Sequence, residues 1–156
     1  MRVASGKWTQ TVGAAAIVFA VSALAATSSA RLMAQTGSSV SAGVYTEEQA
    51  KRGEAISNKL CTSCHGPELS GGEAGPTLVG LEFLGNWNNL TVADFYDRVH
   101  ATMPADAPGT MTPQQTTDVT AYVFKLNKFP AGMTELPIDL ALLKGIKIEG
   151  AQPAAK

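Results

Sequence analysis

The residues of this chain with the clearest chemistry are two cysteines, Cys61 and Cys64, and the histidine that directly follows them, His65. Two residues separate the two cysteines, which gives the pattern C-x-x-C-H. Thiols at this spacing can add across the two vinyl groups of a haem, and the adjacent imidazole can then bind the haem iron. The pattern therefore predicts one haem c, attached covalently through Cys61 and Cys64, with His65 as a ligand of the iron.

Three other uses of a cysteine pair have to be weighed. A zinc site needs a further pair of ligands, but the chain has no other cysteine and only His100 besides His65. A thioredoxin-like redox site needs a βαβ context, whereas a helical pattern precedes this pair and a glycine-rich segment follows it. A plain structural disulfide stays open as the alternative to haem.

Three segments with the apolar spacing of amphipathic helices must position this motif, and each begins with a capping signal. The predicted helices run from Thr46, with Gln49 as its capping partner, into Cys61, from Thr91 to Pro104, and from Thr112, with Gln115 as its capping partner, to Pro130. Between the first two, residues 66–89 are rich in Gly, Pro and Asn and are predicted to form one long loop without secondary structure. A loop of that length in a compact domain is explained if it covers one face of a prosthetic group. The fold class expected is all-α.

Composition and charge indicate a small single domain and argue against nucleic acid as a partner. The chain has 156 residues, 45% of them hydrophobic, and a formal net charge of −1. This length fits one small domain with a leader or a tail. Because no run of Lys and Arg interrupts the sequence, nucleic acid is not expected as a partner.

The first 34 residues are predicted to be a signal peptide and not part of the domain. Arg2 and Lys7 precede an apolar run over residues 12–26, and small residues then offer a cleavage point before Gln35 or, alternatively, after Ala30. An uncleaved membrane anchor is the competing interpretation. Either way the rest of the chain is expected to be exported, to the periplasm, with residues 35–43 as a flexible leader.

With the helices and the motif in place, the sequence resembles the class I c-type cytochromes over residues 44–128. The resemblance implies a small cytochrome c fold, with a domain over residues 44–130 whose three main helices and loops wrap one haem c. It also implies that Gly53 lies at a helix crossing against Tyr122. Pro76, within Gly-Pro-Thr-Leu, would accept a hydrogen bond from His65 and so orient that ligand.

The sixth ligand of the iron is expected to be Met103. It lies on the loop that leaves the second helix, and its dipeptide with the following proline resembles the ligand loop of the family. Met111, Met133 and His100 remain as alternatives, since Met sulfur and His nitrogen are the usual axial ligands.

A narrower resemblance concerns the cytochromes associated with quinoprotein alcohol dehydrogenases. It rests on three stretches, which are CHGPELSGG from Cys64, FLGNWN from Phe83, and VTAYVFKLNKFPAG from Val119. By this resemblance Trp87 would line the haem edge and donate its N–H to a haem propionate, while a plain core position for this tryptophan stays open. The chain is too short to include the dehydrogenase itself.

These expectations add up to an electron-transfer protein and not an enzyme. With His65 and Met103 both bound, the iron has no open position, so one-electron exchange is the chemistry left to it. The expected partners are redox proteins, with a dehydrogenase as donor and an oxidase or another cytochrome as acceptor. Two alternatives are a fixed cytochrome subunit, for which the C-terminal extension over residues 131–156 would either dock or wrap its own domain, and an open-site haem sensor or weak peroxidase.

Overall fold

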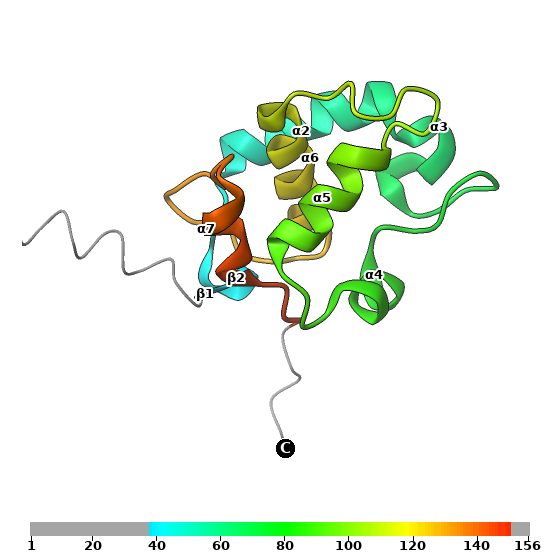
Figure 1. The fold of residues 1–156 in the computed structure, drawn as a ribbon. Helices are drawn as coiled ribbons and strands as arrows, with labels where there is room; N and C mark the ends of the chain where they lie inside the picture. The colour runs from blue at the N-terminus through cyan, green and yellow to red at the C-terminus, as the bar shows by residue number, and fades with distance from the viewer. Residues whose placement is uncertain (1–37, 151–156) are drawn as a thin grey trace, which may run out of the picture. The chain divides into compact units, whose positions relative to one another are not determined.

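The computed structural model describes residues 38–150, so the predicted signal peptide over residues 1–34 lies outside the described part of the chain. The architecture is mostly helical, with one small strand pair (Figure 1). In chain order the elements are β1 (Ser38–Ser39), η1 (Val40–Ala42), α2 (Glu47–Leu60), α3 (Thr62–His65), η2 (Pro67–Leu69), α4 (Gly80–Trp87), α5 (Val92–Thr102), α6 (Pro113–Leu126), α7 (Leu140–Lys144) and β2 (Ile146–Lys147). Within this part of the chain, no helix has the length and apolar character needed to cross a membrane.

The capping signals place the starts of the three long helices as predicted, with one difference. Thr91 and Thr112 begin α5 and α6 with capping boxes in which both reciprocal bonds are present. At α2, the Thr46 side chain accepts the backbone N–H of Gln49, but the Gln49 side chain does not return a bond to Thr46. It pairs with the backbone of Leu136 instead, because that buried segment offers it both a donor and an acceptor.

The crossing of α2 and α6 depends on a glycine. A Cβ atom at Gly53 would overlap the carbonyl oxygen of Asp118 and lie 2.9 Å from the Cβ of Tyr122. Only a residue without a side chain allows this approach, so the predicted crossing of Gly53 with Tyr122 is confirmed. Beside it, the guanidinium of Arg52 donates to both carboxylate oxygens of Asp118, each at 2.9 Å.

The segment predicted as one structureless loop over residues 66–89 contains two helical elements, so that prediction is wrong. η2 follows the cysteine motif directly, and α4 occupies the last third of the segment. Phe83, on α4, is 1% exposed and packs edge-on against Phe95 of α5, with ring centroids 5.5 Å apart. The two glycines of α4 hid this helix from the apolar pattern, because glycine lowers helix propensity.

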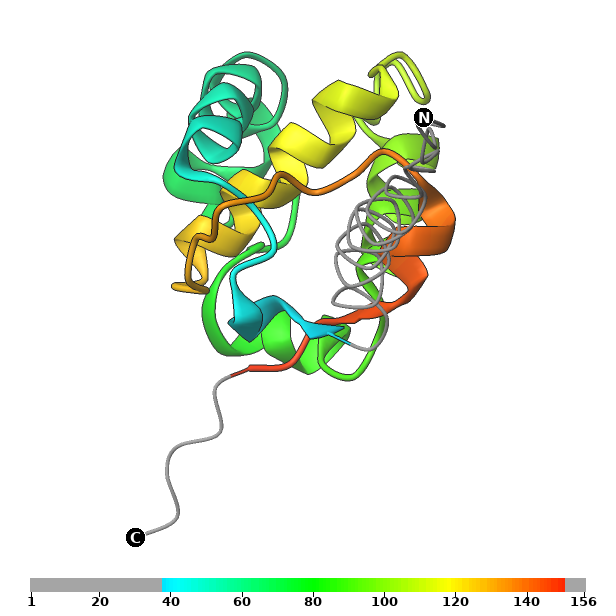
Figure 2. The ribbon, with the colours of Figure 1, turned by 90° about the vertical axis from the view of Figure 1, so that its left-hand side faces the viewer.

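The ends of the described chain close onto the same domain. β1 pairs in parallel with β2, with Ser38 opposite Ile146, and Val40 is fully buried. The structure therefore differs from the flexible leader predicted over residues 35–43, since residues 38–43 are held by this pairing and by burial. In the extension, Leu143, Ile146 and Ile148 are at most 1% exposed. These apolar side chains pack within their own domain, and Figure 2 shows the segment crossing in orange from the end of α6 towards α7.

Candidate functional site

The end of α2 and the single turn of α3 present the cysteine motif. The backbone N–H of Cys61 bonds to Ser57 at 2.9 Å, which ends α2, and the carbonyl of Cys61 accepts the N–H groups of Cys64 at 3.1 Å and of His65 at 2.9 Å. The motif is thus one helical turn, in which Cys61 and Cys64 are three positions apart and lie on one face. Both thiols are free, and burial raises the pKa of Cys61.

His65 is held in one orientation by the loop that follows the motif. Its side chain is buried, and its Nδ1 lies 2.7 Å from the carbonyl oxygen of Pro76. A carbonyl oxygen only accepts, so Nδ1 carries the proton and Nε2 keeps its lone pair. Nε2 is therefore the nitrogen that is free to bind a metal.

Close backbone packing explains why this loop is rich in glycine. A Cβ at Gly75 would lie 3.0 Å from Nδ1 and 3.1 Å from Cε1 of the His65 ring, and one at Gly72 would lie 2.6 Å from the carbonyl oxygen of Cys64. The N–H of Gly71 also bonds to the carbonyl of His65 at 2.7 Å. Side chains at these positions would push the loop away from the motif. The glycines therefore allow the loop to pack closely enough to hold His65 in place.

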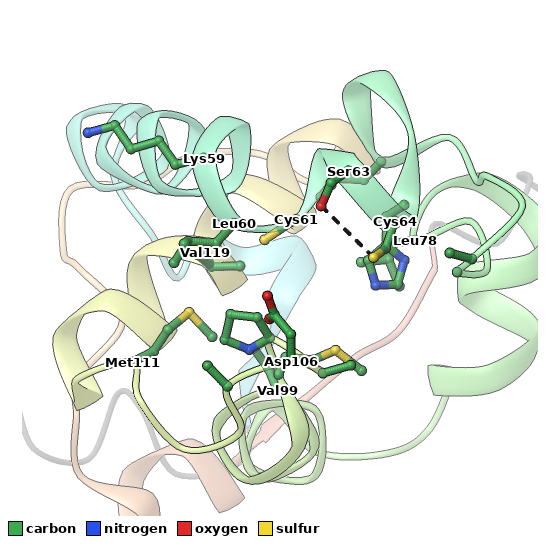
Figure 3. Close-up of a pocket in the computed structure, with 18 of the residues that line it drawn as sticks. Lys59, Leu60, Cys61, Ser63, Cys64, Leu78, Val99, Asp106, Met111 and Val119 are labelled. Atoms are coloured by element: carbon green, nitrogen blue, oxygen red, sulfur yellow. Dashed lines mark hydrogen bonds between the residues drawn. The ribbon is translucent and has the colours of Figure 1, made fainter.

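Two cavities meet beside this motif. The first, of about 630 Å³, is lined by both cysteines, His65, Met103 and apolar side chains of α5 and α6, part of which Figure 3 shows. The second, of about 620 Å³, lies next to α4 and is lined by Asn86, Trp87 and Arg98. The residues that line both cavities are His65, Pro76, Leu78, Phe95, Val99 and Met103.

The residues present fit a haem. The free thiols of Cys61 and Cys64 stand at the first cavity, His65 offers a lone pair, and most of the lining is apolar, which suits a large flat apolar ring. Among the apolar side chains around the motif, Leu60, Leu78, Phe95 and Val99 line a cavity, whereas Phe83 and Tyr122 line neither. Those two side chains are core residues instead.

The placements of the four candidate sixth ligands differ. Met103 begins the chain after α5 and lines both cavities, as His65 does. Met111 is 3% exposed and lines only the first cavity, while Met133 is 98% exposed and lines neither. His100 lies 3.2 Å from the hydroxyl of Thr116 and stacks on Tyr96, outside both cavities. The geometry favours Met103.

Trp87 lies at the second cavity and not beside the cysteines. Its ring meets Phe95 edge-on, with centroids 4.8 Å apart. Arg98 lines the same cavity and was not singled out by sequence reasoning, because an arginine on the polar side of an amphipathic helix gives no signal of its own. Asn127, which holds the loop from the end of α6, was missed because its partners are backbone groups far away in the sequence.

Residues 48–123 match the family model described as cytochrome C oxidase, cbb3-type, subunit III. No curated protein and no solved structure matches the chain. The family match supports a cytochrome c domain of class I type over this stretch. Together with the helical architecture it confirms the predicted all-α, small cytochrome c fold.

Proposed function

We propose that this chain is a mono-haem c electron-transfer protein whose iron is bound by His65 and Met103. The observation that carries the proposal is that Cys61, Cys64, His65 and Met103 line one apolar cavity next to a loop that fixes the histidine ring. A haem bound there supplies one-electron exchange between ferric and ferrous iron. The cytochrome c domain found over residues 48–123 supports this function.

Each residue of the site has a distinct task in this proposal. Cys61 and Cys64 would form the two thioether bonds to a haem, and His65 would bind its iron through Nε2. The carbonyl oxygen of Pro76 accepts a hydrogen bond from Nδ1–H, which fixes the ring and raises its basicity. Met103 would be the second protein ligand of the iron and would leave no open position for substrate or dioxygen, so the chain would carry electrons without catalysing a reaction of its own.

The second cavity is the proposed place of the haem propionates. Trp87 has an indole N–H that can donate to a carboxylate, and Arg98, which lines the same cavity, brings a positive charge. Asp94 also lines this cavity, and its negative charge works against an anionic group, so Arg98 is needed to offset it.

The proposed setting is the periplasm, with residues 1–34 as a signal peptide, residues 44–130 as the cytochrome domain and residues 131–156 as its extension. The proposed partners are a dehydrogenase as donor and an oxidase or another cytochrome as acceptor. The support for a quinoprotein alcohol dehydrogenase as donor is the likeness of three sequence stretches, and the matched family is described as an oxidase subunit. The described domain carries eight Lys and Arg against 13 Asp and Glu, which favours partners with a positive docking face.

The test is the absorption spectrum of the exported protein from a host that matures c-type haem. The wild-type ferric form should show the sulfur-to-iron charge-transfer band, and carbon monoxide should leave the ferrous spectrum unchanged. Met103→Ala should lose the band and bind carbon monoxide, whereas Met111→Ala and His100→Ala should keep the wild-type behaviour. Loss of the band only in Met111→Ala would move the ligand to Met111. A wild-type protein that binds carbon monoxide would instead indicate the open-site sensor or peroxidase.

A further inference from the structure

Asn127, the first residue after α6, connects that helix to the loop beside the site. Its side-chain oxygen accepts the backbone N–H of Gly80 at 2.9 Å. Its side-chain NH₂ donates to the carbonyl of Leu78 at 2.9 Å and to the carbonyl of Val123 at 2.8 Å. One carboxamide thus pairs with the loop backbone in the manner of a short strand while it stays bonded to its own helix.

The backbone that Asn127 holds is continuous with the partner of His65. Leu78 lies two residues after Pro76, whose carbonyl oxygen is 2.7 Å from Nδ1 of His65. On the other side, the N–H of Leu78 bonds to the carbonyl of Leu69 at 2.8 Å. The position of the Pro76 carbonyl is therefore set by hydrogen bonds to the neighbouring residues of its loop. Asn127 makes the bonds that tie this loop to α6.

We propose that Asn127 is a positioning residue for His65, which acts through residues 76–80 to hold the Pro76 carbonyl on Nδ1. This inference rests on the proposed haem function. A well-formed bond from Nδ1 to the carbonyl raises the basicity of the imidazole, and a more basic ligand favours ferric over ferrous iron. If the loop is released, the hydrogen bond from Nδ1 to Pro76 weakens. The reduction potential of the iron should then rise, which favours the ferrous state.

The first variant is Asn127→Ala, which removes all three side-chain bonds. At a fixed ambient potential the ratio of ferrous to ferric protein should rise about three-fold, which at 59 mV per tenfold is about 28 mV towards positive potential. In the proton NMR spectrum of the ferric protein, the Nδ1 proton of His65 should exchange with solvent about tenfold faster or more. Asn127→Ser, which keeps a hydroxyl near the loop, should shift both readouts in the same direction by less, and it serves if Asn127→Ala does not fold.

Gln49 provides the matched control. It is fully buried, and its carboxamide pairs with the backbone of Leu136 in the same way, accepting the N–H at 2.8 Å and donating to the carbonyl at 3.2 Å. Gln49→Ala should lower the stability while it leaves the potential and the Nδ1 exchange at wild-type values.

Three results would overturn the proposal. Wild-type potential and exchange in both Asn127 variants would show that the loop keeps its place without the carboxamide. Equal shifts in Gln49→Ala would show that the effect is only a loss of stability. Failure of the wild-type chain to take up haem, measured on the purified protein by its pyridine haemochrome, would overturn the proposed function and this inference with it. If the wild-type protein binds haem normally and both Asn127 variants keep its potential and its Nδ1 exchange rate, this inference alone is overturned.

Discussion

The loop over residues 66–79 and the described part of the extension, residues 131–150, contain only short helical or strand elements, and each is held to a long helix by a side-chain carboxamide. Asn127 holds the residues that end the loop, and Gln49 holds Leu136 of the extension. The loop follows the cysteine motif and supplies residues to both cavities. Among the described residues of the extension, none lines either cavity.

The two segments differ in what their irregular backbone achieves. Glu68 and Leu69 have positive φ angles of 51° and 55°, and the loop glycines lie against the motif and the His65 ring. A positive φ angle at a residue other than glycine costs free energy, and it persists where contacts with the surrounding structure fix the backbone. The extension instead buries Leu136, Leu143, Ile146 and Ile148. Changes in the loop should therefore alter the haem site, whereas changes in the extension should alter stability alone.

The largest expected effect comes from the motif that the loop covers. His65→Ala and Cys61→Ala should each give no folded haemoprotein, because a group bound only by the folded chain contributes its binding free energy to folding. Haem staining and far-UV circular dichroism of the exported product measure this. The control is Lys147→Ala, at an exposed position of β2, which should yield normal holoprotein. A well-folded, haem-free Cys61→Ala protein would contradict the prediction.

Two leucines, one in each segment, test the comparison directly. Leu69 and Leu143 are both fully buried. Replacement of either by alanine should lower the free energy of unfolding by about 2–5 kcal/mol, measured by denaturant titration. Because Leu69 lines the first cavity, Leu69→Ala should also change the visible spectrum, and Leu143→Ala should not. A spectral change of equal size in both variants would remove the distinction between the segments.

A pair of glycines tests the loop at finer scale. Gly75→Ala places a methyl group 3.0 Å from Nδ1 of His65, so it should tilt the ring and shift the potential, with a loss of stability of about 1–2 kcal/mol. Gly85→Ala on α4 is the control, since a Cβ there meets nothing within 4 Å. It should stabilise the protein by up to about 1 kcal/mol through helix propensity and leave the potential unchanged. An unshifted potential in Gly75→Ala would show that the ring tolerates the methyl group.

The sequence was informative where local chemistry decides the structure. The capping residues Thr91 and Thr112 place the starts of two helices, and the motif Cys61 to His65 predicts its own chemistry from spacing alone. Gly53 could be assigned to the crossing through the family resemblance, and the structure bears that out.

Features set by distant contacts were not predictable in the same way. α4 has two glycines within eight residues, and its formation depends on the packing of Phe83 and Trp87 against Phe95. Residues 38–43 have a composition typical of a linker, and they are ordered by pairing with β2, more than a hundred residues away, and by the burial of Val40. The tasks of Gln49 and Asn127 likewise depend on backbone groups that no local pattern identifies.

The smallest expected effect concerns the residues just before the extension. Tyr45 is 1% exposed, and its hydroxyl donates to the carbonyl of Phe129 at 2.7 Å. Burial, with a lesser contribution from the charge of Glu47, raises the pKa of Tyr45 from 10.0 to about 12. The folded state thus holds this proton more tightly than the unfolded chain does, so its contribution to stability is complete below about pH 10 and is lost as the pH rises towards 12.

Tyr45→Phe should therefore act differently at neutral and at alkaline pH. At pH 7 it removes one buried hydrogen bond, so the free energy of unfolding should fall by about 1 kcal/mol. Between pH 10 and pH 12 the decline of stability with pH should be shallower than in the wild type, because the phenol that drives part of it is gone. Denaturant titrations at pH 7, 10 and 11 measure both effects. An equally steep decline in the variant would mean that other groups govern the alkaline limb, and a changed haem spectrum at pH 7 would mean that the start of the extension is coupled to the site after all.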